Sequence, residues 1–419
     1  MYYLLFLVYL TLCCLVIPRL QFIKRSELTS KLIILLFLAK VIAGLTLGWV
    51  FDYYYSAGND YWDLNAYSTE EYSLLIKDPW QFATNLFRAH YPDRGGFFSS
   101  NDSFWNDLEN NLIIKILAAF NIFSRGNYYI NSLLFNFFGF FGHVALYRIF
   151  AQLYPGRRAA SIIGCFLLPS ALFFSSGLNK DNAVFTLLCL FCYLIFFLMK
   201  HGRSIRRAFF AGTIFAGILL LRNYAALALL PGLIGWFAAS RFDIRKRFSF
   251  PLAFVGTLAL VAGLAATYPS FNPAAVIAQK QQDFFSLPIA RSQIKTDTLA
   301  PSVAGLMNNA PQAFNHGFLR PYLWEAKSSF TLGQAVELGV YLALFLVACV
   351  LSCVSRRKTA IDPFVPFIII SCCFILLLIG YIVPNTQSIV RYRSIYLPFL
   401  ITPLLCYLHP FVAAKRIKI

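Results

Sequence analysis

Long apolar segments alternate with short polar linkers along almost the whole chain. Several of these segments approach the ~20 residues that an α-helix needs to cross a bilayer. We therefore predict about eleven membrane-spanning helices, which form one polytopic domain covering residues 1–419. The expected spans are Tyr2–Pro18, Leu32–Phe51, Tyr128–Leu153, Ala159–Ser175, Asn182–Met199, Ala208–Leu221, Tyr224–Ser240, Phe250–Tyr268, Ala335–Ser355, Phe364–Val383 and Ser394–Ala413.

Two linkers are much longer than the rest and are expected to lie outside the membrane. The first loop covers residues 52–110, and the wider segment 52–127 includes an apolar stretch, Asn111–Phe123, that we expect to lie along the membrane interface. The second loop covers residues 269–334. The predicted fold class is an all-α integral membrane protein with two extracytoplasmic loops.

Composition and charge agree with this class and argue against nucleic acid as a partner. The chain is 59% hydrophobic and only 13% charged, whereas soluble domains carry about 25% charged residues. The net charge is +18, but more than half of the 36 basic residues lie in short linkers on one side of the predicted membrane. Such an excess marks the cytoplasmic side. An odd number of spans then places the N-terminus outside and the C-terminus inside.

The first long loop combines carboxylates with aromatic rings directly after a predicted span. The segment Asp52–Glu109 holds more than half of the 18 acidic residues, and Asp52, Asp60 and Asp63 are the nearest to the membrane. The aromatic residues around them could stack on sugar faces, and they are Tyr53, Tyr54, Tyr55, Tyr61, Trp62 and Tyr67. The alternative is that the three acids are ordinary solvated loop residues. The other acids of the loop are interpreted as solvated surface.

Isolated cations interrupt the linkers on the predicted outer side. They are Lys180, Arg222, Arg320, Arg391 and Arg393, and Glu325 follows shortly after Arg320. The positive-inside rule disfavours basic residues on that side, and isolated charges at membrane depth usually face a cavity or a ligand. The alternatives are that Lys180 forms a simple ion pair with Asp181 and that the arginines extend to lipid headgroups.

One class of ligand would satisfy both charge groups, namely a sugar carried on a polyprenyl phosphate or diphosphate. A carboxylate would take the proton of the acceptor hydroxyl. The cations would stabilise the negative charge left on the departing phosphate. An inverting transfer of this kind needs one base and no carboxylic acid, because phosphate leaves unprotonated.

The sequence gives no positive sign of a metal site or another cofactor. The five histidines are scattered, without the spacing of a zinc site. The carboxylates could bind a divalent cation, but nothing in their spacing requires one.

The helix followed by an acidic, tyrosine-rich outer loop resembles the GT-C class of membrane glycosyltransferases. In that class an aspartate of the first outer loop is the catalytic base, and Gly58-Asn59-Asp60 with Tyr67 downstream is the best match; Asp52 and Asp63 compete with Asp60. Three further stretches resemble membrane proteins of bacterial surface-polysaccharide gene clusters: Pro169–Asp181, Phe318–Ala326 and Arg391–Pro398. The chain differs from many GT-C members in its extra N-terminal helix and in lacking a large soluble C-terminal domain.

The resemblance implies a glycosyltransferase of the bacterial cytoplasmic membrane whose active site faces the periplasm. Its expected partners are a polyprenyl-linked donor, a glycan or lipid acceptor and membrane lipids. An O-antigen-type polymerase or ligase is a variant of the same chemistry. A lipid-linked glycan flippase or other transporter is the alternative from another class, and a non-catalytic assembly subunit is a third. Charges gathered at one membrane face favour the enzyme, and charges near the midplane favour transport.

Overall fold

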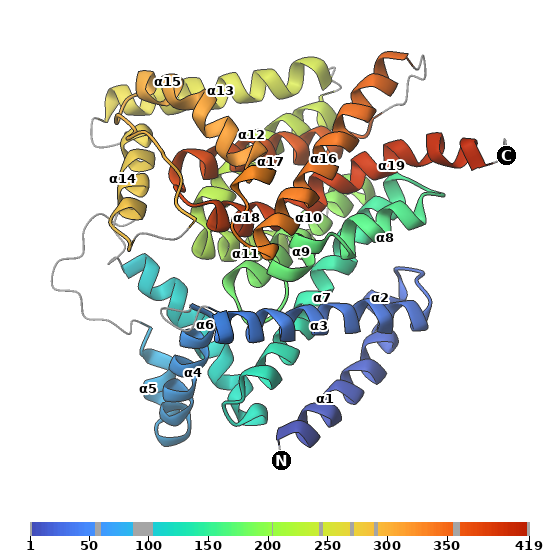
Figure 1. Ribbon diagram of the computed structural model, residues 1–419, viewed down its shortest axis with the longest axis vertical. Helices are drawn as coiled ribbons and strands as arrows, with labels where there is room; N and C mark the ends of the chain where they lie inside the picture. The colour runs from blue at the N-terminus through green and yellow to red at the C-terminus, as the bar shows by residue number, and fades with distance from the viewer. Residues whose placement is uncertain are drawn as a thin grey trace. The chain divides into compact units, whose positions relative to one another are not determined.

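The computed structural model describes residues 2–54, 60–86, 104–202, 204–242, 246–268, 272–288, 292–354 and 361–416. Every regular element in these ranges is helical (Figure 1). Two compact units are present: the first comprises Met1–Ile149, Cys165–Leu198 and Arg203–Leu221, and the second comprises Phe150–Gly164, Met199–Gly202 and Arg222–Ile419.

Most helices of the first unit come from the N-terminal half of the chain. They are α1 (Tyr2–Val16), η1 (Ile17–Arg19), α2 (Gln21–Lys24), α3 (Ser30–Tyr54), α4 (Asp60–Lys77), α5 (Pro79–Thr84), α6 (Phe104–Ser124), most of α7 (Tyr128–Leu153), α9 (Pro169–Phe174), most of α10 (Lys180–His201) and α11 (Ile205–Leu221).

The second unit contains the C-terminal helices. They are most of α8 (Arg158–Phe166), α12 (Asn223–Arg241), α13 (Lys246–Thr267), α14 (Pro273–Phe285), α15 (Val303–Phe314), η2 (Asn315–Leu319), η3 (Leu323–Glu325), α16 (Ser329–Val354), α17 (Phe364–Ile382), α18 (Thr386–Ser394) and α19 (Leu397–Arg416).

Seven helices of the described ranges are long and apolar enough to cross a membrane. They are Tyr2–Arg19, Ser30–Tyr54, Tyr128–Leu153, Lys180–His201, Asn223–Arg241, Ser329–Val354 and Phe364–Ile382. The number rises to eight if the bent pair Thr386–Ser394 and Leu397–His409 forms one span. The chain is therefore a helical membrane protein, while the count of about eleven spans stays a prediction.

Two expected spans are not single straight helices. The expected span 159–175 is divided into α8 and α9 immediately before Pro169, because a proline disfavours the helical conformation of the residue that precedes it. The last expected span begins earlier than predicted, as α18, and bends by 63° into α19. Pro398 stands in the first turn of α19, where its missing N–H is tolerated.

Much of the segment that we expected to be a loop after Asp52 is helical. Helices α4 and α6 pack against each other, and the predicted interfacial stretch lies inside the longer α6. The buried residues of α4 are Tyr61, Leu64, Asn65, Ser68 and Glu71, which share one helix face. The Glu71 carboxylate forms an ion pair with Lys115 of α6 at 3.2 Å. This acid, which we expected to be solvated, is therefore buried between α4 and α6.

Glycines permit close helix packing inside each unit. In the first unit a Cβ on Gly44 of α3 would lie 2.8 Å from the backbone nitrogen of Gly177, and a Cβ on Gly139 of α7 would lie 2.3 Å from the Asn182 side chain of α10. In the second unit a Cβ on Gly380 of α17 would collide with the carbonyl of Ala313 in α15. Small residues at helix crossings are typical of membrane proteins.

Candidate functional site

The three predicted catalytic carboxylates lie in the first unit, where two helices end and begin. Asp52 is in the last turn of α3, and Asp60 and Asp63 are in the first turn of α4. All three side chains are exposed. Asp60 and Asp63 are three residues apart and share one side of the helix, and the positive end of the helix dipole stabilises both anions. Gly58 and Asn59 lie outside the described residues.

The aromatic residues next to these acids fall into two groups. Tyr61 is only 2% exposed and packs on Phe51 at 4.3 Å between ring centroids. Trp62 stacks on Tyr128 at 4.2 Å and donates a hydrogen bond from Nε1 to the Gly48 carbonyl at 3.1 Å. These two rings therefore fix α4 to α3 and α7.

The rings that remain accessible are other members of the predicted set. Tyr53, Tyr54 and Tyr67 are exposed, so they are the aromatic residues that a sugar could reach. Tyr55 lies outside the described residues.

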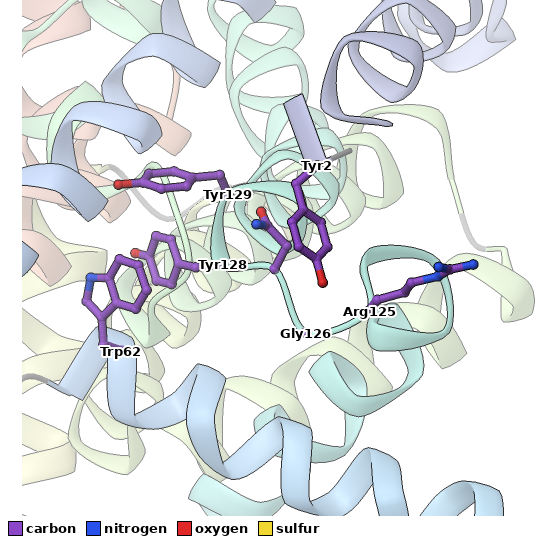
Figure 2. A pocket seen from close by; sticks show the side chains of 7 residues that line it. Tyr2, Trp62, Arg125, Gly126, Tyr128 and Tyr129 are labelled. Atoms are coloured by element: carbon purple, nitrogen blue, oxygen red, sulfur yellow. The ribbon is translucent and has the colours of Figure 1, made fainter. Parts of the chain in front are cut away.

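A small pocket opens beside the stacked rings (Figure 2). Its volume is about 270 Å³, and its lining is Tyr2, Trp62, Arg125, Gly126, Asn127, Tyr128 and Tyr129. The pocket is slightly smaller than the ~300–1,000 Å³ of ordinary ligand sites. None of the three acids lines it, so we assign it no part in the chemistry.

Lys180 pairs with a residue that the sequence did not suggest. Its ammonium lies 2.9 Å from the Glu109 carboxylate of α6, and Asp181 is fully buried in the first turn of α10. Asn179 caps α10, because its side-chain oxygen accepts the backbone N–H of Asn182 at 2.7 Å. The turn before α10 is thus held by an ion pair and by a side-chain cap.

A buried ammonium lies beneath this turn. Lys40 of α3 is only 1% exposed, and therefore does not extend to the membrane surface. It donates to the Ser175 carbonyl, and it lies 3.3 Å both from the Asn182 side-chain oxygen and from His143 Nε2. These partners come from helices α7 and α10 and from the turn after α9, far from Lys40 in the sequence.

In the second unit, α18 carries the predicted cations Arg391 and Arg393, and between them the Tyr392 ring, which also lies close to Arg222. The guanidinium of Arg222 lies 4.7 Å from the centroid of the Tyr392 ring, and that of Arg391 lies 5.8 Å from the same centroid. The two cations therefore lie close enough to contact one phosphate or diphosphate, well within about 20 Å, or two screening lengths at physiological salt.

Arg393 joins α18 to the segment that carries Arg320. Its side chain is 3% exposed, and Nη1 donates to the carbonyls of Gly317 and Arg320 at 3.2 and 2.7 Å. The Glu337 carboxylate of α16 attracts the same guanidinium and accepts a hydrogen bond from Tyr341. Arg393 is thus a buried residue that connects α18 to the segment of Gly317 and Arg320.

Glu325 orders the cationic loop. Its carboxylate accepts the backbone N–H of Tyr322 at 3.1 Å and lies 3.4 Å from Nε of Arg320. The Arg320 carbonyl therefore joins Arg393 to Arg320, and Glu325 orients the Arg320 side chain. A direct role of Glu325 in substrate binding stays a prediction.

His316 completes the cluster and was missed by the sequence analysis. It is 1% exposed. Burial, together with the charge of Arg320, lowers the pKa of His316 from 6.5 to about 4, against a smaller opposing effect of a backbone hydrogen bond to Gly380. The ring is therefore neutral near pH 7.

Two buried nitrogens of this cluster have no hydrogen-bond partner among the described residues: Arg393 Nε and His316 Nδ1. The Nε of Arg320 is in the ion pair with Glu325. A buried donor without an acceptor costs about 1–3 kcal/mol. An anion or water near these two atoms would complete their bonding. We define Arg222, Arg320, Arg391, Arg393 and His316 as the basic cluster.

Within the described ranges, no group of three or more histidine, cysteine, aspartate or glutamate side chains is arranged to hold a metal ion. No protein-family model matches the chain, and comparison with curated proteins and with solved structures finds no significant similarity.

Proposed function

We propose that the chain is a membrane glycosyltransferase. It moves a sugar or a glycan from a polyprenyl-phosphate-linked donor to an acceptor at the outer face of the cytoplasmic membrane, in the synthesis of cell-envelope polysaccharide or glycolipid. The proposal retains the predicted topology of about eleven spans, with the N-terminus and the two long loops outside.

The observation that carries the proposal is the basic cluster of the second unit. Arg222 and Arg391 share one aromatic ring, and Arg393 has a buried Nε without a hydrogen-bond partner among the described residues. A buried guanidinium donor without an acceptor suits an anion that arrives with the substrate. A phosphate or diphosphate presents several oxygens to such donors, and charge-assisted bonds to them are short and strong.

The second part of the proposal is the base that the sequence predicts in the first outer loop. We assign the role of general base to Asp60, with Asp63 or Asp52 positioning the acceptor. The base takes the proton of the acceptor hydroxyl, whose oxygen then bonds to the anomeric carbon. The bond from that carbon to the phosphate oxygen breaks, and the phosphate leaves with the electron pair. The anomeric configuration inverts in this single displacement.

The test measures transfer in membranes supplied with a polyprenyl-linked sugar donor. We expect Asp60→Asn to lower the rate by about 10²–10⁴-fold, the usual contribution of a general base, while donor binding persists. Glu70→Gln is the matched control, since it changes an exposed carboxylate of the same helix. Collapse in Asp52→Asn or Asp63→Asn with a normal rate in Asp60→Asn would move the base to that residue. Full activity in all three variants would end the proposal.

The size of the transferred group separates the two versions of this enzyme. A polymerase or ligase of O-antigen type would move a whole repeat unit instead of one sugar. The same assay with donors that carry one sugar or one repeat unit distinguishes them.

One observation favours the alternative of a lipid-linked glycan flippase or other transporter. Lys40 is buried in the interior of a candidate span, and α8 and α9 are interrupted. Buried charges and discontinuous helices mark many transport sites. Movement of a labelled lipid-linked glycan across vesicles without transfer to an acceptor, lost in Lys40→Met, would support transport over transfer.

A further inference from the structure

Helix α15, in the second predicted outer loop, has an outward face made almost entirely of apolar residues. Val303 is 72% exposed, Met307 71% and Phe314 49%. Ala304 and Pro311 are also exposed. At 100° per residue these five positions fall within one stripe of about 100°. Asn308 lies at the edge of this stripe.

A second apolar face of α15, next to this stripe, packs against protein. Ala313 is buried, and Leu306 and Ala310 pack in one cluster with it and with Tyr381 of α17. The Tyr381 hydroxyl donates to the Leu306 carbonyl at 2.7 Å. The remaining side of the helix carries the polar residues Asn308, Asn309 and Gln312. Helix α15 is therefore amphipathic, and its exposed apolar stripe is the part that needs an apolar neighbour.

The neighbouring helix α14 shows that this exposure is not general in the loop. Gln279 and Gln282 are exposed on α14, and Gln279 bonds to Asp283 at 3.0 Å. Its apolar residues Ile277 and Ala278 are directed to the same cluster that α15 covers. Helix α14 therefore exposes a polar face, whereas α15 exposes an apolar stripe.

The position of α15 identifies the bilayer as its neighbour. Tyr381 and Gly380, which contact α15, belong to the last turn of the candidate span α17. Trp324 is 80% exposed and Leu323 56% exposed, a few residues before the candidate span α16 begins. Tryptophan is enriched where a span leaves the membrane. The exposed apolar residues thus lie beside the ends of two candidate spans.

We propose that α15 and the step Leu323–Trp324 are embedded in the lipid surface, with the outward stripe of α15 at the boundary between headgroups and acyl chains. The occupant of this face is phospholipid. Because η2 continues directly from α15 and carries His316, lipid contact fixes the height of the basic cluster relative to the headgroups. The inference rests on burial and position, and it stands whether or not the chain transfers sugars.

The test places one additional tryptophan on each of the two helices. Met307→Trp reports on the outward stripe of α15, and Gln282→Trp is the matched control on the exposed face of α14. Each variant is reconstituted in liposomes of phosphatidylcholine, with and without bromine near the top of the acyl chains. The fluorescence of the six native tryptophans is subtracted with the wild-type protein.

We expect brominated lipid to remove at least about half of the fluorescence added in Met307→Trp, since interfacial helices bury their apolar face ~5–10 Å into the headgroup boundary. Aqueous acrylamide should quench it weakly, and Gln282→Trp should show the reverse. Quenching of position 307 by acrylamide alone would overturn the proposal. Protection from both quenchers would also overturn it, because a protein neighbour would then cover the face. Val303→Trp, on the same stripe, repeats the measurement if Met307→Trp is poorly folded.

Discussion

Replacing Lys40 by methionine tests whether the buried ammonium holds the turn between α9 and α10 in place. Methionine preserves the apolar stem and removes the charge and its hydrogens. The Ser175 carbonyl loses its donor, as does the side-chain oxygen of Asn182. His143 Nε2 keeps a contact with the Ser175 hydroxyl at 3.2 Å.

The magnitude follows from the acceptors left behind. Each buried acceptor without a donor costs about 1–3 kcal/mol, which gives about 2–6 kcal/mol for the two. Removing a buried charge returns part of that, because the ammonium no longer has to be desolvated. We expect a net destabilisation of about 2–4 kcal/mol, a large share of the ~5–15 kcal/mol that stabilises an ordinary domain.

Thermal unfolding of the purified protein in detergent measures the effect. Lys31→Met is the matched control, since Lys31 is exposed in the first turn of the same helix, and its change should stay within about 0.5 kcal/mol. Equal stability of Lys40→Met and the wild type would refute the reasoning. It would mean that desolvation of the ammonium cancels all its contacts.

Three further predictions concern topology and charge. A cysteine introduced at the exposed Thr298 should react with a membrane-impermeant reagent from outside intact cells. Reaction only after permeabilisation would reverse the predicted topology. Ser99 is an equivalent position in the first loop, but it lies outside the described residues. Arg393→Lys should lower the melting temperature, because the lysine ammonium is one bond closer to Cα than Nη1, which donates to the Gly317 and Arg320 carbonyls, and is more strongly hydrated. An unchanged melting temperature would show that Arg393 does not stabilise this region. Glu109→Gln should destabilise by no more than about 1 kcal/mol, since the Lys180–Glu109 pair is partly exposed and such pairs are weak; a larger loss would show that Lys180 depends on that carboxylate.

Helix ends with local signals could be predicted from the sequence. The span Tyr128–Leu153 coincides with α7 at both ends. It begins after Gly126, which has a φ of +79°, and Asn127, whose side chain accepts the backbone N–H of Ile130 at 3.1 Å. Glycine tolerates that backbone conformation and asparagine is a preferred N-cap residue. Both signals lie within a few residues of the boundary they set.

Helix α4 was missed because its buried face is mostly polar. Asn65, Ser68 and Glu71 are buried together with Leu64, and this spacing is helical. The face carries too few apolar residues for hydrophobic periodicity to reveal it. Asn65 and Ser68 instead bond to the Gly126 carbonyl and to Asn121 at 3.0 Å each, partners more than 50 positions away. Distant hydrogen bonds of this kind leave no local pattern in the sequence.

In the candidate site, too, some residues could be predicted from the sequence and one could not. Residue type and membrane side were sufficient to select Arg222, Arg320, Arg391 and Arg393, and the structure draws two pairs of them together. His316 could not have been selected, because nothing around it in the sequence distinguishes a buried imidazole from an exposed one. Its environment is made by Arg320 and by Gly380 of a distant helix.

That environment makes His316 a source of acid sensitivity. Its pKa in the folded protein, about 4, lies below the 6.5 of the free side chain, so between these values the unfolded chain binds a proton that the folded protein does not. Stability from this group is complete above pH 6.5 and falls as the pH decreases towards 4, by at most about 3 kcal/mol. The nearby Asp297 opposes the shift, and Arg320 enlarges it.

Thermal unfolding of the wild type and of His316→Asn between pH 7.5 and 4.5 measures this contribution. Asparagine keeps a polar group at the position but does not titrate, so the variant should be less stable at neutral pH and should lose less stability on acidification. The slopes of stability against pH separate titration from simple loss of packing. Loss of packing alone would lower the stability of the variant by the same amount at every pH. Parallel pH profiles would show that the imidazole has the same proton affinity in the folded and unfolded states. The prediction that His316 is held neutral by burial beside Arg320 would then be wrong.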